Sequence, residues 1–406
     1  MKRRYLASAI CAIAIAMTTA CSGDGGATTD VGADGERFDG SYTLMTFGPF
    51  STAGNQGADD YDQIRVGALA AAKKVNAAGG VNGKSIRIES CDTRGDSNRA
   101  VSCAQKAVAD GLPAVVGTFE GAGEYLAVLE QGKVPAIGAV GLSGEYASTA
   151  AFPVYNGLEI YLGLFALMKQ QGVHDIGFPF QNDTAGAEAG LAPIVAAGRA
   201  LGLTIETIPV EPDQTDYSPV VARAATHAGI VIGLVDKQGI PFVQSLRQTN
   251  YDGAVGGSMS AEAIETLGDL AEGIYSVNAY LPASYTQHPA VKEYVELMDS
   301  VDDKTLLDDA AANAYNSVLI FAKVAEGLAD VTGPALLEKL PAAPIATGLR
   351  PPVSFAAPPA SVKGAFPDLP RLFDVNVVFE QVKGGVLQPI SGNFFDAISA
   401  EEVPFN

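Results

Sequence analysis

The side chains that most often carry out catalysis are few in this sequence and form no known catalytic pattern. The three histidines, His174, His227 and His288, lie in separate segments without the H-x-x-x-H or H-x-x-E-H spacing of metal-dependent hydrolases. The stretch Gly141-Leu142-Ser143-Gly144 is one residue short of the G-x-S-x-G turn that exposes a nucleophilic serine. We therefore predict no enzymatic activity and no cofactor, and keep a secreted hydrolase as the weaker alternative.

Two of the four cysteines, Cys91 and Cys103, are close enough in sequence to form a local disulfide. Closing such a short loop stabilises a protein by about 3 kcal/mol in the chain-entropy model. A metal site is the alternative, but two cysteines without a nearby histidine are a poor ligand set. The sequence therefore predicts a disulfide and no metal.

The N-terminal segment has the features of an export signal. Lys2, Arg3 and Arg4 precede a short apolar stretch, and Cys21 follows it in a context that resembles the bacterial lipobox. We interpret residues 1–20 as a lipoprotein signal peptide and Cys21 as the lipidation site, with ordinary signal cleavage as the alternative. Residues 21–40 are rich in Gly, Asp and Thr and are expected to form a flexible tether. The predicted location is the outer face of the bacterial cell membrane, with the lipid anchor as the only membrane contact.

The composition excludes some classes of partner. The chain has 406 residues, 48% of them hydrophobic, with 26 Lys and Arg against 46 Asp and Glu and a net charge of −20. Such an acidic protein is not expected to bind nucleic acid, which requires clustered basic residues. No segment after the signal has 18 uninterrupted apolar residues, so no transmembrane helix is expected there. Acidic pairs such as Asp308-Asp309 are interpreted as solvated helix ends.

The rest of the chain alternates between strand and helix patterns, which is typical of a mainly parallel sheet covered by helices on both faces. The first series has strands at 42–47, 85–89, 113–117 and 134–137 and helices at 59–76, 98–109 and 122–131. The second has helices at 158–171, 185–201, 218–227 and 238–249 and strands at 175–180, 204–210, 230–234 and 254–256. A strand at 273–278, helices at 289–299 and 306–329, a region rich in Pro and Gly, and a hairpin at 372–390 complete the chain. The predicted fold class is α/β, with two lobes.

Several motifs of this pattern resemble the leucine/isoleucine/valine-binding proteins, the type I substrate-binding proteins of ABC importers. They are Gly48-Pro49, Gly67-Ala68, the stretch Val75-Asn76-Ala77-Ala78-Gly79-Gly80-Val81-Asn82-Gly83, Cys91-Asp92, and the helix end Lys106-Ala107-Val108-Ala109-Asp110-Gly111 before Val115-Val116-Gly117. The Ala-Ala-Gly-Gly-Val-Asn-Gly segment is the most specific of them. Physically it is a helix stop followed by a tight turn, so it reports on the fold and not on the ligand.

The resemblance implies two Rossmann-like lobes joined by three crossovers, with a small-molecule ligand in the cleft between them. We expect a first lobe of residues 41–154 and 283–355 and a second of residues 155–282 and 356–406. The crossings are expected near residues 153–157, 278–282 and 351–359. The resemblance further implies a monomer that closes around its ligand and delivers it to an ABC permease. A ligand-sensing accessory protein that signals through a partner is the alternative with the same fold.

The resemblance also assigns a ligand site at loops that follow strands. The residues at or beside the family's ligand positions are Phe47, Thr118, Phe119, Glu120, Gly121, Gly141, Leu142, Ser143, Glu159, Asp236, Met259 and Tyr315. Asp236 could instead be a helix cap, and packing alone could explain Tyr315.

The residues at these positions differ from those that hold an amino acid in the family. Gly121 replaces a serine that contacts the ligand carboxylate, Leu142 replaces a threonine, and Met259 replaces an acidic residue that holds the ammonium group. Only the hinge carboxylate is retained, as Glu159. An apolar, aromatic or weakly polar ligand therefore fits better than a free branched-chain amino acid, because a buried charge without partners costs several kcal/mol. A register shift of one or two residues would restore Ser143 or Ser260 and weaken this interpretation.

Overall fold

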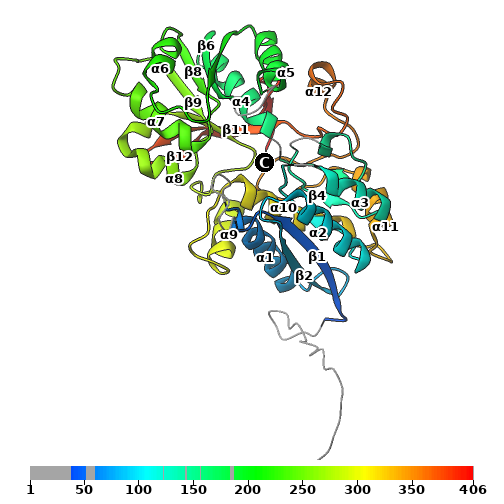
Figure 1. Ribbon diagram of the computed structural model, residues 1–406. Coiled ribbons are helices and arrows are strands. Elements are labelled where there is room, and N and C mark those ends of the chain that lie inside the picture. Colours follow the sequence, from blue (N-terminus) through cyan, green and yellow to red (C-terminus); the bar gives the residue numbers. More distant parts are fainter. Residues whose placement is uncertain are drawn as a thin grey trace, which may run out of the picture.

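The computed structural model describes residues 38–51, 60–121, 123–141, 144–155, 157–182 and 187–405. Within these ranges the chain forms two mainly parallel sheets, each in its own lobe (Figure 1). The α/β fold with two lobes predicted from the alternating pattern is therefore confirmed. Residues 1–37, which include the predicted signal, Cys21 and most of the predicted tether, lie outside the described residues.

The first sheet is entirely parallel and contains five strands in the order β2-β1-β3-β4-β5. They are β1 (Ser41–Gly48), β2 (Ser85–Asp92), β3 (Val115–Val116), β4 (Ala136–Ile137) and β5 (Ala151–Phe152). Successive residues of a strand point to opposite faces, and both faces are apolar here: Leu44 and Met45 belong to two different core clusters. Both faces must therefore be covered by helices.

The helices of this lobe come from two distant parts of the chain. They are α1 (Asp62–Ala77), α2 (Ser97–Ala109), α3 (Glu124–Gly132), α9 (Pro289–Asp299), α10 (Asp309–Ala325) and α11 (Gly333–Lys339). Figure 1 shows α9 and α10, in yellow, beside α1, in blue. Gly67 permits the close approach of α1 to α10, because a Cβ atom there would lie 2.3 Å from the carbonyl oxygen of Ala311.

The second sheet has eight strands in the order β13-β12-β11-β10-β9-β8-β6-β7. They are β6 (Asp175–Gln181), β7 (Thr204–Val210), β8 (Gly229–Ile232), β9 (Ala254–Gly257), β10 (Tyr275–Asn278), β11 (Asn376–Lys383), β12 (Val386–Asp396) and β13 (Glu402–Val403). Strands β6 to β10 are parallel, and β10 to β13 pair antiparallel. The helices are α4 (Gly157–Gln170), α5 (Ala187–Ala200), α6 (Ser218–Ala224), α7 (Asp236–Leu246), α8 (Ala261–Leu267) and α12 (Ala360–Ala365).

The elements that the sequence patterns did not predict are all short. Strand β5 and strand β13 have two residues each, and helices α8, α11 and α12 have six or seven. Short single-turn segments η1 (Gly144–Tyr146), η2 (Gly268–Ala271) and η3 (Leu340–Ala342) are also present. Elements of this length are too short to establish a hydrophobic periodicity. The helix predicted at 306–329 is shorter in the structure, because the Asp308 side chain caps α10 by accepting the Ala311 N–H.

The glycine-rich segment after α1 forms the predicted helix stop and tight turn. Gly80 has a φ of +73°, and a Cβ atom there would lie 2.2 Å from the carbonyl oxygen of Lys84. The turn also reaches across the lobe: the Asn82 side chain donates to the carbonyl of Ala325 at 3.0 Å and accepts the N–H of Gly327 at 3.1 Å. The turn therefore satisfies backbone groups at the C-terminus of α10.

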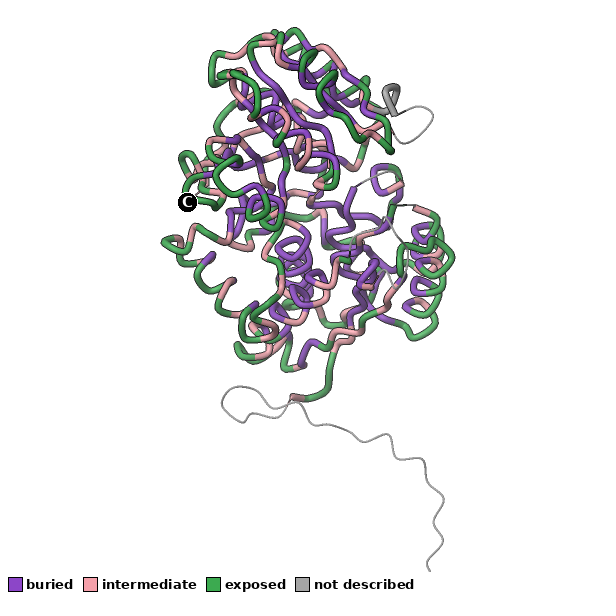
Figure 2. The backbone as a smooth tube through the Cα atoms, turned by 60° about the vertical axis from the view of Figure 1, so that its left-hand side comes forward, coloured by how far each residue is buried: buried purple, intermediate pink, exposed green. Residues whose placement is uncertain are grey.

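Three connections join the lobes, between β5 and α4, between β10 and α9, and between α11 and β11. In Figure 2 buried backbone runs through the interior of each lobe, while exposed segments lie mainly on the outer helices and turns. Figure 1 places the C-terminal end of the chain between the two lobes.

Candidate ligand site

The predicted residues that directly follow β3 and β4 in the described ranges lie at the carboxyl edge of the first sheet, where parallel α/β sheets bind ligands. The loop after β3 contains Thr118, Phe119, Glu120 and Gly121. The carbonyl of Thr118 accepts the N–H of Val140 at 2.9 Å, which links this loop to the one after β4. The structure thus brings these loops together, as the strand order predicts.

Thr118 and Phe47 contact the same buried tyrosine. The Tyr125 hydroxyl lies 3.3 Å from the Thr118 hydroxyl and donates to Glu145 Oε1 at 3.0 Å. The Phe47 ring packs edge-on against the Tyr125 ring, with centroids 5.1 Å apart. Burial and the nearby Glu145 raise the pKa of Tyr125 well above its usual value, so its hydroxyl remains a donor. Phe47 and Thr118 are fully buried, and both contact Tyr125 in the interior of the lobe.

Glu120 is almost completely buried, with 4% of its surface exposed. Its Oε1 atom has no hydrogen-bond partner among the described residues. Burial raises the pKa of Glu120 to about 7. A hydrogen bond from Thr93 opposes this shift, whereas the negative charges of Glu145 and Asp92 increase it. This carboxyl group is therefore out of water and incompletely bonded, which is costly unless another group binds it.

Phe119 belongs to an aromatic group at the same edge of the sheet. It is half-buried and stacks on Tyr61, with ring centroids 4.4 Å apart and an interplanar angle of 24°. Tyr155, in the first connection, lies near Tyr61. Burial raises the pKa of Tyr155, and the negative charges of Asp309 and Glu159 raise it further, with a smaller contribution from Tyr61. Aromatic rings and carboxylates are thus neighbours where the lobes join.

The loop after β4 is held from both sides at Gly141. The N–H of Gly141 donates to the carbonyl of Tyr155 at 3.0 Å, and its own carbonyl accepts the Tyr146 hydroxyl at 2.6 Å. The next two predicted residues, Leu142 and Ser143, lie outside the described residues. Whether either contacts a ligand stays a prediction.

The predicted residues of the second lobe are more scattered. Asp236 begins α7 and is half-exposed, and Val235, not Asp236, is the cap residue of that helix. Met259 packs into the core cluster beneath α8. Glu159 lies fully buried in the first turn of α4.

Tyr315 packs in the core of the first lobe. Its ring lies edge-on to Tyr294, with centroids 5.0 Å apart, and only 2% of the residue is exposed. This is the packing role that the sequence analysis kept as its alternative.

Arg350, which the sequence analysis did not select, touches all three connections between the lobes. Its guanidinium donates to the carbonyl of Val154 at 2.7 Å, forms an ion pair with Asp374, and lies over the Tyr280 ring at 5.0 Å. A signal was present in the sequence: Arg350 is the one charged residue between Lys339 and Lys363.

Asp309 corrects the interpretation of the Asp308-Asp309 pair as a merely solvated helix end. Its carboxylate accepts the N–H of Ala279 at 2.7 Å and so ties α10 to the second connection. Beside it, the Tyr280 hydroxyl donates to Asn313 at 3.0 Å, and the Asn313 amide donates to the carbonyl of Gly138 at 2.7 Å. These contacts connect the second crossing to the loop after β4.

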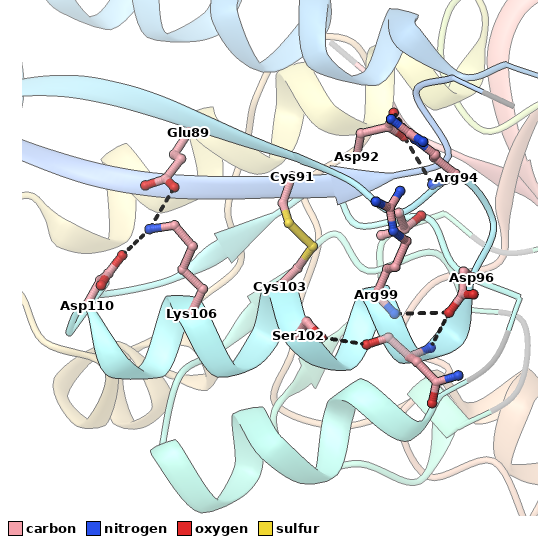
Figure 3. The surroundings of a disulfide bond; sticks show 12 residues. Glu89, Cys91, Asp92, Arg94, Asp96, Arg99, Ser102, Cys103, Lys106 and Asp110 are labelled. Atoms are coloured by element: carbon pink, nitrogen blue, oxygen red, sulfur yellow. Dashed lines mark hydrogen bonds and ion pairs between the residues drawn. A yellow bond between two sulfur atoms is a disulfide. The ribbon is translucent and has the colours of Figure 1, made fainter. Parts of the chain in front are cut away.

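The structure contains the predicted disulfide between Cys91 and Cys103, whose Cα atoms are 6.0 Å apart. Figure 3 shows that it joins β2 to α2. One turn further along α2, Lys106 reaches Glu89 at 3.0 Å and also pairs with Asp110 (Figure 3). The disulfide and the Lys106–Glu89 ion pair together hold α2 against β2, the edge strand of the first sheet.

The described ranges lack two kinds of feature. No group of three or more His, Cys, Asp or Glu residues there is arranged to hold a metal ion. None of the described helices is long and apolar enough to span a bilayer. A polar surface pocket, lined in part by His227 and Tyr251, lies where β8 and β9 begin, at the edge opposite to the predicted site.

Comparisons with known proteins agree with this architecture. The model of the periplasmic binding protein family matches residues 48–363. A 57-residue segment is 47% identical to a Leu/Ile/Val-binding protein homolog 1 of Brucella abortus, and the match covers 14% of this chain and 15% of the length of that relative.

Two solved structures share the fold. One is the branched-chain amino acid transporter substrate-binding protein of Streptococcus pneumoniae in complex with isoleucine, with 17% identity, a TM-score of 0.66, and coverage of 86% of this chain and 98% of the other. The second is a fatty acid ABC transporter substrate-binding protein of Thermomonospora curvata, with 18% identity, a TM-score of 0.67, and coverage of 92% and 99%.

Proposed function

Because the chain belongs to the periplasmic binding protein family, we propose that it captures a small organic ligand between its lobes and delivers it to an ABC permease. The ligand class is amino-acid-like, amide, or aromatic and apolar. Closure of the lobes about their three connections traps the ligand and creates the surface that the permease recognises. The protein acts as a monomer and has no catalytic step.

The observation that carries this proposal is the position of the loops after β3 and β4. They meet at the carboxyl edge of the first sheet, next to the connections to the second lobe, and they present both a half-buried aromatic ring and a carboxyl group. Carboxyl edges of parallel strands are where α/β proteins bind small molecules. The ligand-binding set of the proposal is the one predicted from the sequence, with Phe119, Glu120, Gly121 and Gly141 as its first-lobe centre.

The lobe boundaries and the anchor are part of the same proposal. The first lobe comprises residues 41–154 and 283–355, and the second comprises residues 155–282 and 356–406. The signal is removed before Cys21, which carries the lipid and holds the protein at the outer face of the cell membrane.

The test starts from residues 22–406 purified gently from an exporting host. Native mass spectrometry identifies any small molecule that remains bound. A thermal-shift screen then compares branched-chain and aromatic amino acids, aromatic acids, short amides and small apolar acids. A co-purified molecule or a strong shift with one of these classes supports the proposal. No bound molecule and no shift with any class would count against it.

The anchor needs a separate measurement. Whole-cell fractionation of the wild type and of Cys21→Ser, followed by mass spectrometry of the N-terminal peptide, should show a lipid-modified, membrane-associated wild type and a released variant. Equal membrane association of both would reject Cys21 as the anchor.

A further inference from the structure

We propose that Glu120 receives an N–H-bearing group of the ligand, an ammonium or amide nitrogen, and excludes ligands that present a carboxylate to the first lobe. The inference rests on the proposed function, because it assumes that the ligand lies at the loops after β3 and β4. It adds the chemical class of the ligand group and the residue that selects it.

The Glu120 carboxyl group has unfilled hydrogen-bonding capacity. The residue is 4% exposed, so water has little access to it, and Oε1 lacks a hydrogen-bond partner in the described part of the chain. The Thr93 side chain donates a hydrogen bond to this carboxyl group. A buried acceptor without a donor is costly, and a ligand N–H would remove that cost.

Other carboxylates lie around Glu120. The carboxylates of Glu145, Asp92 and Asp96 act on it, and all three carry the same sign. Among the buried residues that the structure describes, Arg350 is the one basic side chain, and its charge is already paired with Asp374. A ligand carboxylate would therefore meet repulsion without a compensating cation, whereas an ammonium or amide nitrogen would be attracted.

The residue beside Glu120 provides an aromatic surface. Phe119 directly precedes Glu120 and stacks on Tyr61 at 4.4 Å, which places a half-buried aromatic surface beside the carboxyl group. Such a surface suits an apolar or aromatic ligand body and also attracts a cation. The combination describes a small amine or amide with an apolar body.

Two matched probe series separate charge from shape. The first contains 3-methylbutylamine, 3-methylbutanamide and 3-methylbutanoate, and the second contains phenethylamine, phenylacetamide and phenylacetate. Isothermal titration calorimetry at pH 8 with residues 22–406 is expected to show the amine or the amide of at least one series binding tenfold or more tightly than its carboxylate. Preference for the amine would identify a cationic ligand group, and equal binding of the amide would identify a neutral N–H donor.

Three variants test the role of Glu120. Glu120→Gln preserves the shape and is expected to weaken amine binding at least tenfold and to reduce the discrimination against the carboxylate. Glu124→Gln removes the same charge from an exposed position on α3 and should leave all affinities within twofold. Thr93→Val keeps the Glu120 charge and should retain the preference for N–H donors, which provides a second variant if Glu120→Gln folds poorly.

The outcomes distinguish the inference from the function on which it rests. Carboxylates bound as tightly as amines by the wild type, or an unchanged amine affinity in Glu120→Gln, would overturn the inference and leave the binding function standing. Leucine bound more tightly than 3-methylbutylamine, with no effect of Glu120→Gln, would do the same. Failure of every probe, combined with no co-purified molecule, would overturn both.

Discussion

Arg350 and Asp374 form an ion pair in the interior of the protein, with 0% and 4% of their side chains exposed. The same guanidinium donates to Val154 in the first connection and covers Tyr280 in the second. One side chain therefore holds together segments that are far apart in sequence. All three connections would bend in the proposed closure of the lobes, so this contact would couple ligand capture to stability.

Replacing Arg350 by Met should lower the free energy of unfolding by about 3–5 kcal/mol, because the buried Asp374 carboxylate would lose the cation that faces it. Urea denaturation provides the measurement. Lys292→Met is the control: it breaks an exposed pair with Glu296, in which both side chains are 63% exposed, and should change stability by less than about 1 kcal/mol. Equal losses in the two variants would contradict a special role for Arg350.

Removing the disulfide should destabilise the first lobe. The double variant Cys91→Ser/Cys103→Ser is expected to lose about 3 kcal/mol, since the unfolded chain gains freedom when the loop is opened. Thermal unfolding with and without reductant checks this: reductant should lower the melting temperature of the wild type and leave that of the variant unchanged. A melting temperature of the wild type that does not respond to complete reduction would argue against a stabilising bridge.

The stability of the protein should depend on pH through Glu120. Burial raises its folded-state pKa from 4.5 to about 7, so the folded protein binds more protons than the unfolded chain between these values. Stability therefore falls as pH rises through this window, by up to roughly 3 kcal/mol for this group. Glu120→Gln, which resembles the protonated acid, should be more stable than the wild type at pH 8 and similar to it at pH 4.5. Glu124→Gln should follow the wild type at both values.

His227 should contribute in the same direction, in a pH window that begins at the unfolded-state value of 6.5. Burial alone would lower its pKa, but hydrogen bonds to Asp175 at 3.0 Å and Glu206 at 2.7 Å outweigh this and raise it above 6.5. The imidazolium thus stabilises the folded state fully below pH 6.5, and the contribution disappears as pH rises through the folded-state pKa. His227→Gln should lower the melting temperature at pH 6 more than at pH 9. His174→Gln, at an exposed position, should show no such difference.

A single methyl group at Gly67 should disturb the packing of α1 on α10. The Cβ atom of Gly67→Ala would lie 2.3 Å from the carbonyl oxygen of Ala311, so the two helices would have to separate. The expected cost is about 1–3 kcal/mol, measured by urea denaturation. Gly364→Ala in α12 meets nothing within 4 Å and should be neutral or slightly stabilising. A neutral Gly67→Ala would show that the helices adjust without cost.

The features predicted from sequence are those that local pattern determines. The helix predicted at 289–299 coincides with α9, and the strand predicted at 204–210 coincides with β7, because a hydrophobic period and the flanking Pro and Gly residues mark such elements directly. The cysteine pair and the glycine-rich turn are also short-range features. The loops of the candidate site after β3 and β4 were assigned by the resemblance to a known family, and the strand pattern agrees with it because carboxyl ends of parallel strands lie at one edge of a sheet.

The burial and the partners of individual side chains were decided only by the tertiary structure. The contact of Arg350 with Val154 spans 196 positions, and that of Asp309 with Ala279 spans 30, so no local window contains both partners. From the sequence alone, Phe47 and Tyr315 could belong either to the ligand site or to the hydrophobic core. The structure packs both rings against other aromatic rings. In the sequence, Glu120 does not differ from the many other acidic residues of this chain. Only the folded structure buries it and leaves its Oε1 atom without a hydrogen-bond donor among the described residues. Periodicity is a property of neighbouring residues, whereas the environment of a side chain depends on segments that only the folded chain brings together.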